Sequence, residues 1–79
     1  MNLSLTLDTS ADAAYVRASD DKVARTEKKD SQRLIDLADD GKIVGFEFLS
    51  VSKGVELEGL PWREEITHLF EDCNIKVFA

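Results

Sequence analysis

The sequence contains few of the residues that mark specialised chemistry. Its 79 residues include one cysteine, one histidine, one tryptophan and one proline. A single cysteine cannot form an intrachain disulfide, and no apolar run is long enough to span a bilayer. The first residues also lack the basic start and long apolar run of a signal peptide. We therefore expect a cytoplasmic protein, without a membrane partner.

Basic residues are also scarce, since 10 lysines and arginines face 16 aspartates and glutamates, giving a formal net charge of −6. This balance argues against binding nucleic acid or an anionic membrane by charge alone. A basic protein is the partner that this charge fits better. The chain is short enough to support only one hydrophobic core, so we expect residues 1–79 to form a single domain.

The clearest pattern lies between Leu34 and Val51 and is typical of one β-hairpin. Apolar residues alternate with polar ones on both sides of a central turn, which is the period-2 signature of strands with one buried face. The apolar positions are Ile35, Leu37, Val44, Phe46 and Phe48. In the turn, Asp40 and Gly41 favour the positive φ angles that a tight hairpin needs.

Similar alternation predicts further strands, and the C-terminal third predicts a helix. The expected strands cover residues 2–7, 13–19, 23–28, 33–38 and 42–51, with a loop from Ser52 to Gly59. Pro61 suits the first turn of a helix over 61–73, and the tail 75–78 is a candidate short last strand. The apolar stripe of this helix comprises Trp62, Ile66, Leu69, Phe70 and Cys73.

These elements predict an α+β fold. We expect an antiparallel β-meander of about five strands, covered on one face by the single amphipathic C-terminal helix. The apolar face would carry Leu5, Val16, Ile35, Val44, Phe46 and Phe48, and the opposite face would be charged.

Three motifs in chain order resemble a small prokaryotic family, catalogued as domain of unknown function 2283. Residues 7–17 (LDTSADAAYVR) are similar to its Y-D-x-x-A-D-A-x-Y-[IV]-R opening, and residues 23–27 (VARTE) to its middle element. Residues 36–47 (DLADDGKIVGFE) are similar to its D-x-D-x-D-G-x-[IL]-V-G-[IF]-E hairpin. The sequence departs at Leu7, where the pattern usually has Tyr, and at Ala14, where it has a larger aliphatic residue. The resemblance covers about residues 7–52.

This resemblance implies a compact β-rich domain of unassigned activity. Some members of the family look like partners of small ribonuclease-type toxins. The helical tail from Leu60 lies outside the resemblance.

One group of polar residues is a candidate binding patch on the charged face of the sheet. Two guanidinium groups, a phenol and two carboxylates on one face would suit a carboxylate, a phosphate or a side chain of a partner. The candidate patch comprises Tyr15, Arg17, Arg25, Glu27 and Glu47. The alternative is a lattice of surface charges that sets the strand register without binding anything.

Other polar residues have structural explanations. The acids near the turns, such as Asp8, Asp12 and Asp40, suit turn formation, and the Asp39-Asp40-Gly41 run lacks the spacing of a calcium loop. His68 has no second histidine to complete a metal site, and acidic neighbours of Cys73 oppose a reactive thiolate. We therefore expect no catalytic residue, metal or cofactor.

Three functions remain open. The first is a non-enzymatic protein-interaction module that self-associates as a homodimer, through an exposed strand edge or the charged sheet face. The second is an antitoxin-like inhibitor of a small basic ribonuclease-type toxin. The third is an unrecognised enzyme or anion-binding protein that uses the candidate patch.

Overall fold

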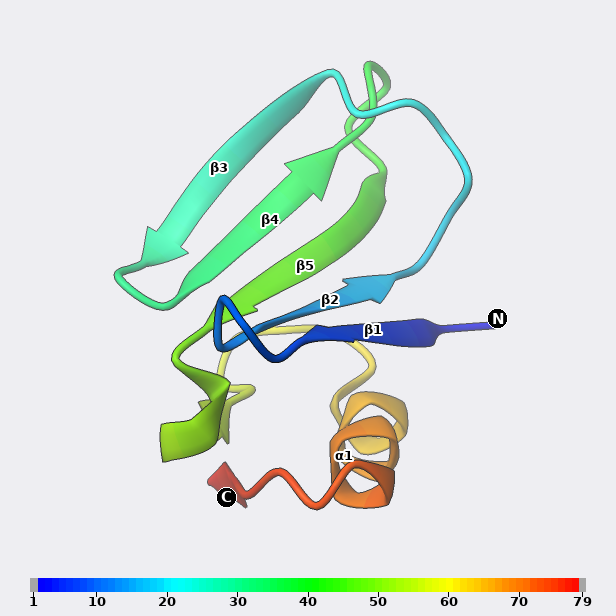
Figure 1. Cartoon of the computed structure of the whole chain (residues 1–79). Helices are drawn as coiled ribbons and strands as arrows, with labels where there is room; N and C mark the ends of the chain where they lie inside the picture. Colours follow the sequence, from blue (N-terminus) through cyan, green and yellow to red (C-terminus); the bar gives the residue numbers. More distant parts are fainter. Residues whose placement is uncertain (1, 79) are drawn as a thin grey trace.

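A computed structural model describes residues 2–78 of the chain (Figure 1). It has an antiparallel sheet of five strands, one helix and a second sheet of two short parallel strands, so the predicted α+β class is confirmed. The large sheet contains β1 (Ser4–Asp8), β2 (Ala13–Arg17), β3 (Arg25–Asp30), β4 (Arg33–Leu37) and β5 (Ile43–Leu49). A 3-10 helix (Val51–Lys53), β6 (Val55–Glu56), α1 (Arg63–Asp72) and β7 (Val77–Phe78) follow.

The strand order is β1-β2-β5-β4-β3, so the expected simple meander was wrong. Strand β5 lies in the centre, between β2 and β4, because it carries the most apolar sequence and gains most from burial on both sides. All six residues of β3 are exposed, and this polar strand lies at the edge. The chain crosses from β2 to that edge through residues 18–24, which form the long arc in Figure 1.

One face of the large sheet, the inner face, forms the core. Val16 pairs with Phe46 and Ala14 pairs with Phe48, and all four side chains are buried. The ring of Phe48 meets Phe70 of α1 edge to face, with 5.0 Å between centroids. The helix therefore covers the inner face, as the amphipathic pattern predicted.

The helix does not provide this cover alone. Residues 51–60, which the sequence analysis assigned mainly to a loop, supply four buried side chains to the same cluster. These are Val51, Val55, Leu57 and Leu60. The tail contributes β7, which pairs in parallel with β6 (Val55 with Val77) and does not join the large sheet. The helix, the segment 51–60 and the tail together cover the inner face, in place of the expected single helix.

Element bounds differ from the expected ones where local backbone geometry intervenes. Helix α1 begins at Arg63, two residues later than expected, because Trp62 has a left-handed φ of 57°. Asn74, with φ of 60°, ends the helical path after the tenth residue of α1. Strand β3 covers Arg25–Asp30 and is therefore shifted by two residues toward the C-terminus from the expected 23–28. Neither described helix has the length and apolarity that crossing a membrane requires.

Candidate functional site

The opposite side of the large sheet, the outer face, is organised around Tyr15. Its hydroxyl donates a 2.8 Å hydrogen bond to Oδ2 of Asp36, across the sheet from β2 to β4. Thr26 on β3 donates to the other oxygen of the same carboxylate at 2.6 Å. Gly45 on β5 lies beneath the phenol, and a Cβ there would lie 2.5 Å from Cζ of Tyr15. The missing side chain of Gly45 is what lets the phenol reach Asp36.

Arg17 completes this arrangement. Its guanidinium carbon lies 5.4 Å from the centroid of the Tyr15 ring, within the range of a cation–π contact. Nη1 of Arg17 also donates to the carbonyl oxygen of Ser19 at 3.3 Å. Partial burial, followed by the hydrogen bond to Asp36 and its negative charge, raises the pKa of Tyr15 to about 12 from 10.0. The phenol is therefore a hydrogen-bond donor at neutral pH.

The structure divides the candidate patch between the two faces. Tyr15 and Glu47 are directly paired on the outer face, and Arg17 lies two residues along from Tyr15. Glu27 pairs with Ile35, which itself pairs with Phe46, so Glu27 belongs to the inner side of the sheet. Arg25 shares that side.

The expectation that all five residues share one face was therefore wrong. An all-polar strand gives no hydrophobic signal for which set of alternate residues faces the core. Arg25 and Glu27 bind one another instead, with 3.4 Å between Nε and Oε2, and both side chains are more than half exposed.

The polar side chains of the outer face interact with one another. The carboxylate of Asp36 accepts two hydrogen bonds, and the phenol of Tyr15 is held protonated. The side chain of Arg17 lies against the Tyr15 ring. These groups satisfy one another, which is the pattern of a lattice that fixes the sheet.

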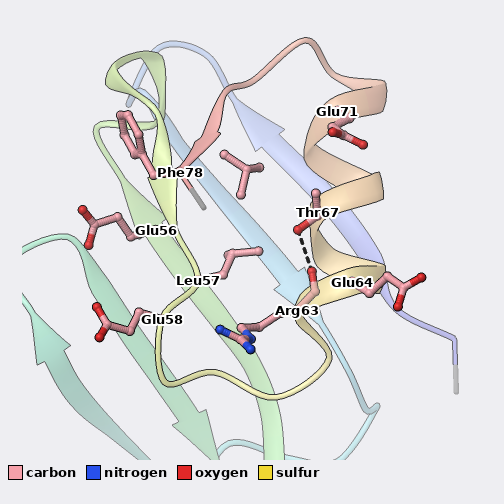
Figure 2. Close-up of a pocket in the computed structure, with 9 residues that line it drawn as sticks. Glu56, Leu57, Glu58, Arg63, Glu64, Thr67, Glu71 and Phe78 are labelled. Atoms are coloured by element: carbon pink, nitrogen blue, oxygen red, sulfur yellow. Dashed lines mark hydrogen bonds between the residues drawn. The ribbon is translucent and has the colours of Figure 1, made fainter.

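A separate groove lies between α1 and the segment containing β6, on the surface turned away from the large sheet (Figure 2). It has a volume of about 790 Å³. Leu57 and Thr67 point into the space between the two walls, and Phe78 of β7 borders its upper end. The remaining lining residues are Glu56, Glu58, Arg63, Glu64, Glu71 and Val77.

Charge in the groove is strongly biased. Four carboxylates line it, two from each wall, against the single guanidinium of Arg63. Glu56 and Glu58 alternate with the buried Leu57, and Figure 2 shows that their carboxylates and that of Glu64 point away from the space between the walls, at its margins. The guanidinium of Arg63 lies between the walls at the lower end. The rim is therefore acidic and the floor apolar, a combination that suits a ligand with cationic groups spaced around an apolar anchor.

The β6 wall is held in place by a buried arginine. Nη1 of Arg33 donates to the carbonyl oxygens of Glu56 (3.2 Å) and Glu58 (2.7 Å). Nε and Nη2 of Arg33 bind Oδ2 of Asp30 at 2.9 and 2.7 Å. These bonds fix the backbone of the segment from Glu56 to Glu58, which forms one wall of the groove.

The sequence analysis missed both the groove and Arg33, although signals for them exist. Arg33, Ile35 and Leu37 are alternate residues of one strand, so the period of 2 places Arg33 on the inner face. The acids of α1 recur at Glu64 and Glu71, two helical turns apart, which places them on one side. The placement of this side of α1 opposite the β6 segment, however, depends on tertiary structure.

Within residues 2–78, no three histidines, cysteines, aspartates or glutamates are placed to share a metal ion. Cys73 is a free, half-buried thiol at the end of α1. His68 is exposed, and its Nδ1 lies 3.5 Å from Oε1 of Glu71.

Comparison with known families gives one match. A family model described as a protein of unknown function (DUF2283) matches residues 5–52, which is more than half of the chain. These residues contain the whole large sheet from Leu5 onward, including the outer-face network. The groove residues, 56–78, lie beyond the match. No curated protein and no solved structure matches the chain.

Proposed function

The chain belongs to the DUF2283 family of unknown function, and we propose that it is a non-enzymatic interaction module whose acidic groove binds a basic segment of another protein. The observation that carries this proposal is the groove itself, with carboxylates on both walls and an apolar floor. Its volume of about 790 Å³ suits a few side chains of a partner. A net charge of −6 would add long-range attraction for a cationic partner.

The preferred ligand is an amphipathic segment with an apolar residue flanked by lysines or arginines. The apolar residue would contact Leu57, Val77 and Phe78, of which Phe78 is 41% exposed. The flanking cations would face Glu64 and Glu71 on the helix. Charge would then govern the association rate and the choice of partner, and the apolar contact would supply much of the affinity.

A narrower form of this proposal is an antitoxin-like inhibitor. Such a protein would cover the basic active surface of a small ribonuclease-type toxin with the acidic rim of the groove. The support for this form is the charge of the groove residues, which lie beyond the part of the chain that matches the family.

The enzyme or anion-binding alternative has less support. It required the guanidinium groups of Arg17 and Arg25 to converge on one face. Arg17 lies on the outer face against Tyr15, whereas Arg25 lies on the inner side beside Glu27. A cytoplasmic location is part of our proposal, because the single cysteine provides no disulfide for stability in an oxidising compartment.

The test is titration with a fluorescent peptide that alternates lysine or arginine with leucine, followed by anisotropy. We expect saturable binding that weakens as salt increases, because exposed charges are screened. The double variant Glu64→Gln, Glu71→Gln removes both helix carboxylates of the groove and should weaken binding by roughly tenfold or more. A peptide with glutamate in place of the basic residues should not bind.

The matched control is Glu65→Gln combined with Asp72→Asn, which also removes two exposed carboxylates from α1. Neither Glu65 nor Asp72 lines the groove. The affinity of this control variant for the peptide should equal that of the unmodified protein. Equal losses in the control and in the Glu64→Gln, Glu71→Gln variant would show that net charge, and not the groove, determines binding.

A further inference from the structure

The two edges of the large sheet differ in how they are protected. Edge strand β3 has five charged residues out of six (sequence RTEKKD) and an irregular register between Lys28 and Asp30. Charged side chains and bulges are devices that prevent an edge from pairing with another chain. Strand β1, with the sequence SLTLD, has one charged residue, at its end, and pairs with β2 without any register shift.

Strand β1 also has a free side. Among residues 2–78 its only strand partner is β2, and four of its five residues are exposed. In an antiparallel sheet, alternate residues of an edge strand direct their N–H and C=O groups away from the neighbouring strand. The helix layer lies against the face of β1, where Leu5 packs on the core, and leaves these backbone groups uncovered.

We propose that β1 pairs in antiparallel fashion with β1 of a second copy of this chain, with the two-fold axis at Thr6. Ser4 then lies opposite the partner's Asp8, Leu5 opposite the partner's Leu7, and Thr6 opposite the partner's Thr6. The two five-stranded sheets become one continuous sheet with a shared inner face. The interface is isologous, so it closes as a dimer.

The sequence of β1 explains why a second copy is the occupant. Its side chains are arranged symmetrically about Thr6, with a leucine on each side and polar residues beyond. An antiparallel copy therefore places apolar side chains on apolar ones and polar side chains on polar ones. Leu7, which is 39% exposed in the single chain, would be covered by the partner's Leu5.

The test compares the solution mass of variants at the symmetry centre. Thr6 is exposed on the outer face, so Thr6→Lys should fold normally while placing two like charges opposite each other across the axis. We expect its dimer dissociation constant to rise by roughly tenfold or more, and Thr6→Glu to behave alike. The matched control, Thr9→Lys, makes the same exchange in the exposed turn just beyond β1 and should leave the dimer intact.

Mixing the two variants gives the sharpest result. A lysine in one copy would face a glutamate in the other, so a mixture of Thr6→Lys and Thr6→Glu should form a heterodimer although each alone dissociates. Failure of the mixture to associate would overturn the register centred on Thr6. Equal dimerisation of the Thr6→Lys variant and the unmodified chain would overturn the β1 interface, as would a monomeric mass of the unmodified chain up to about 1 mM.

Hydrogen exchange provides a second measurement that needs no variant. Within residues 4–8, the alternate amides that do not bond to β2 should exchange faster on dilution, because dissociation exposes them, while the amides of β5 should not respond. Exchange in β1 that is independent of concentration would contradict the proposal. Salt separates this proposal from groove binding: each copy carries −6, so screening should strengthen the dimer and weaken the binding of a basic peptide.

Discussion

The guanidinium of Arg33 lies buried on the inner face of the sheet, and its Nη1 donates a 2.7 Å hydrogen bond to the carbonyl oxygen of Glu58. Only 8% of Arg33 is exposed. A buried cation of this kind is costly unless its donors are paired, and Asp30 with the two backbone carbonyls provides that pairing. One side chain therefore joins β4 to the segment that forms both core cover and groove wall.

Replacement of the Arg33 side chain should destabilise the segment that covers the core and forms one wall of the groove. In Arg33→Leu, the carbonyl oxygens of Glu56 and Glu58 lose their donor in a part-buried position. We expect the free energy of unfolding to fall by about 1–3 kcal/mol, measured by urea denaturation. Arg25→Leu is the control, because Arg25 is exposed and makes only a surface ion pair, and its cost should stay below about 0.5 kcal/mol. Equal costs would show that the buried bonds contribute nothing.

The same ion pair predicts a response to acid. The hydrogen bond from the side chain of Arg33, with a backbone hydrogen bond from Gln32, lowers the pKa of Asp30 from 3.8. Since the folded pKa lies below the unfolded one, this stabilisation is complete above pH 3.8 and is lost as the pH falls through the folded value.

Thermal melting between neutral and acidic pH should therefore show a smaller acid-induced loss of stability in Asp30→Asn, which cannot titrate at this position. An unchanged profile in Asp30→Asn would contradict the assigned role.

The alternation of apolar and polar residues was sufficient to predict which side chains of the large sheet are buried. Val16, Phe46 and Phe48 alternate with polar residues, so their burial on one face followed from a period of 2. The strand order did not follow, because pairing of β2 with β5 depends on which strand gains most from a central position. The prediction that the candidate patch lies on one face was wrong for Arg25 and Glu27, because the sequence of a polar strand does not indicate which residues face the core. The groove needed the tertiary pairing of β6 with β7.

The phenol of Tyr15 should ionise at a higher pH than an exposed tyrosine. Tyr15 is the only tyrosine of the chain, so the near-ultraviolet absorbance of phenolate reports this residue alone. We expect the phenol of the folded protein to ionise at about pH 12. In the Asp36→Asn variant unfolded in urea, it should ionise at about pH 10, because neither burial nor the Asp36 carboxylate then raises the pKa of Tyr15. Titration of the folded protein at an ordinary tyrosine pKa would contradict the hydrogen bond to Asp36.

The raised pKa also has a consequence for stability. Protonated Tyr15 is favoured in the folded state, so its contribution is complete below pH 10.0 and is lost as the pH rises toward about 12. Stability of the unmodified protein should therefore decline over this interval, and Tyr15→Phe should lack that component of the decline. At neutral pH, Tyr15→Phe should cost about 0.5–1.5 kcal/mol, the net value of one hydrogen bond, since Thr26 still donates to Asp36.

The last prediction concerns the contact between Gly45 and Tyr15. A Cβ at position 45 would lie 2.5 Å from Cζ and 2.7 Å from Cε2 of the ring, so Gly45→Ala forces the phenol away from Asp36. We expect a cost of about 1–3 kcal/mol in urea denaturation. In a Tyr15→Phe background the cost should persist, because both ring atoms remain.

In a Tyr15→Ala background the ring is absent, and the sign of the effect should reverse. Gly45 has an ordinary φ, so alanine is compatible with the backbone there. Gly45→Ala should then stabilise the protein by about 0.4–1 kcal/mol, through the lower conformational entropy of the unfolded chain. A double-mutant cycle measures this coupling directly. Equal costs in all three backgrounds would show that the glycine is required for another reason than the phenol above it.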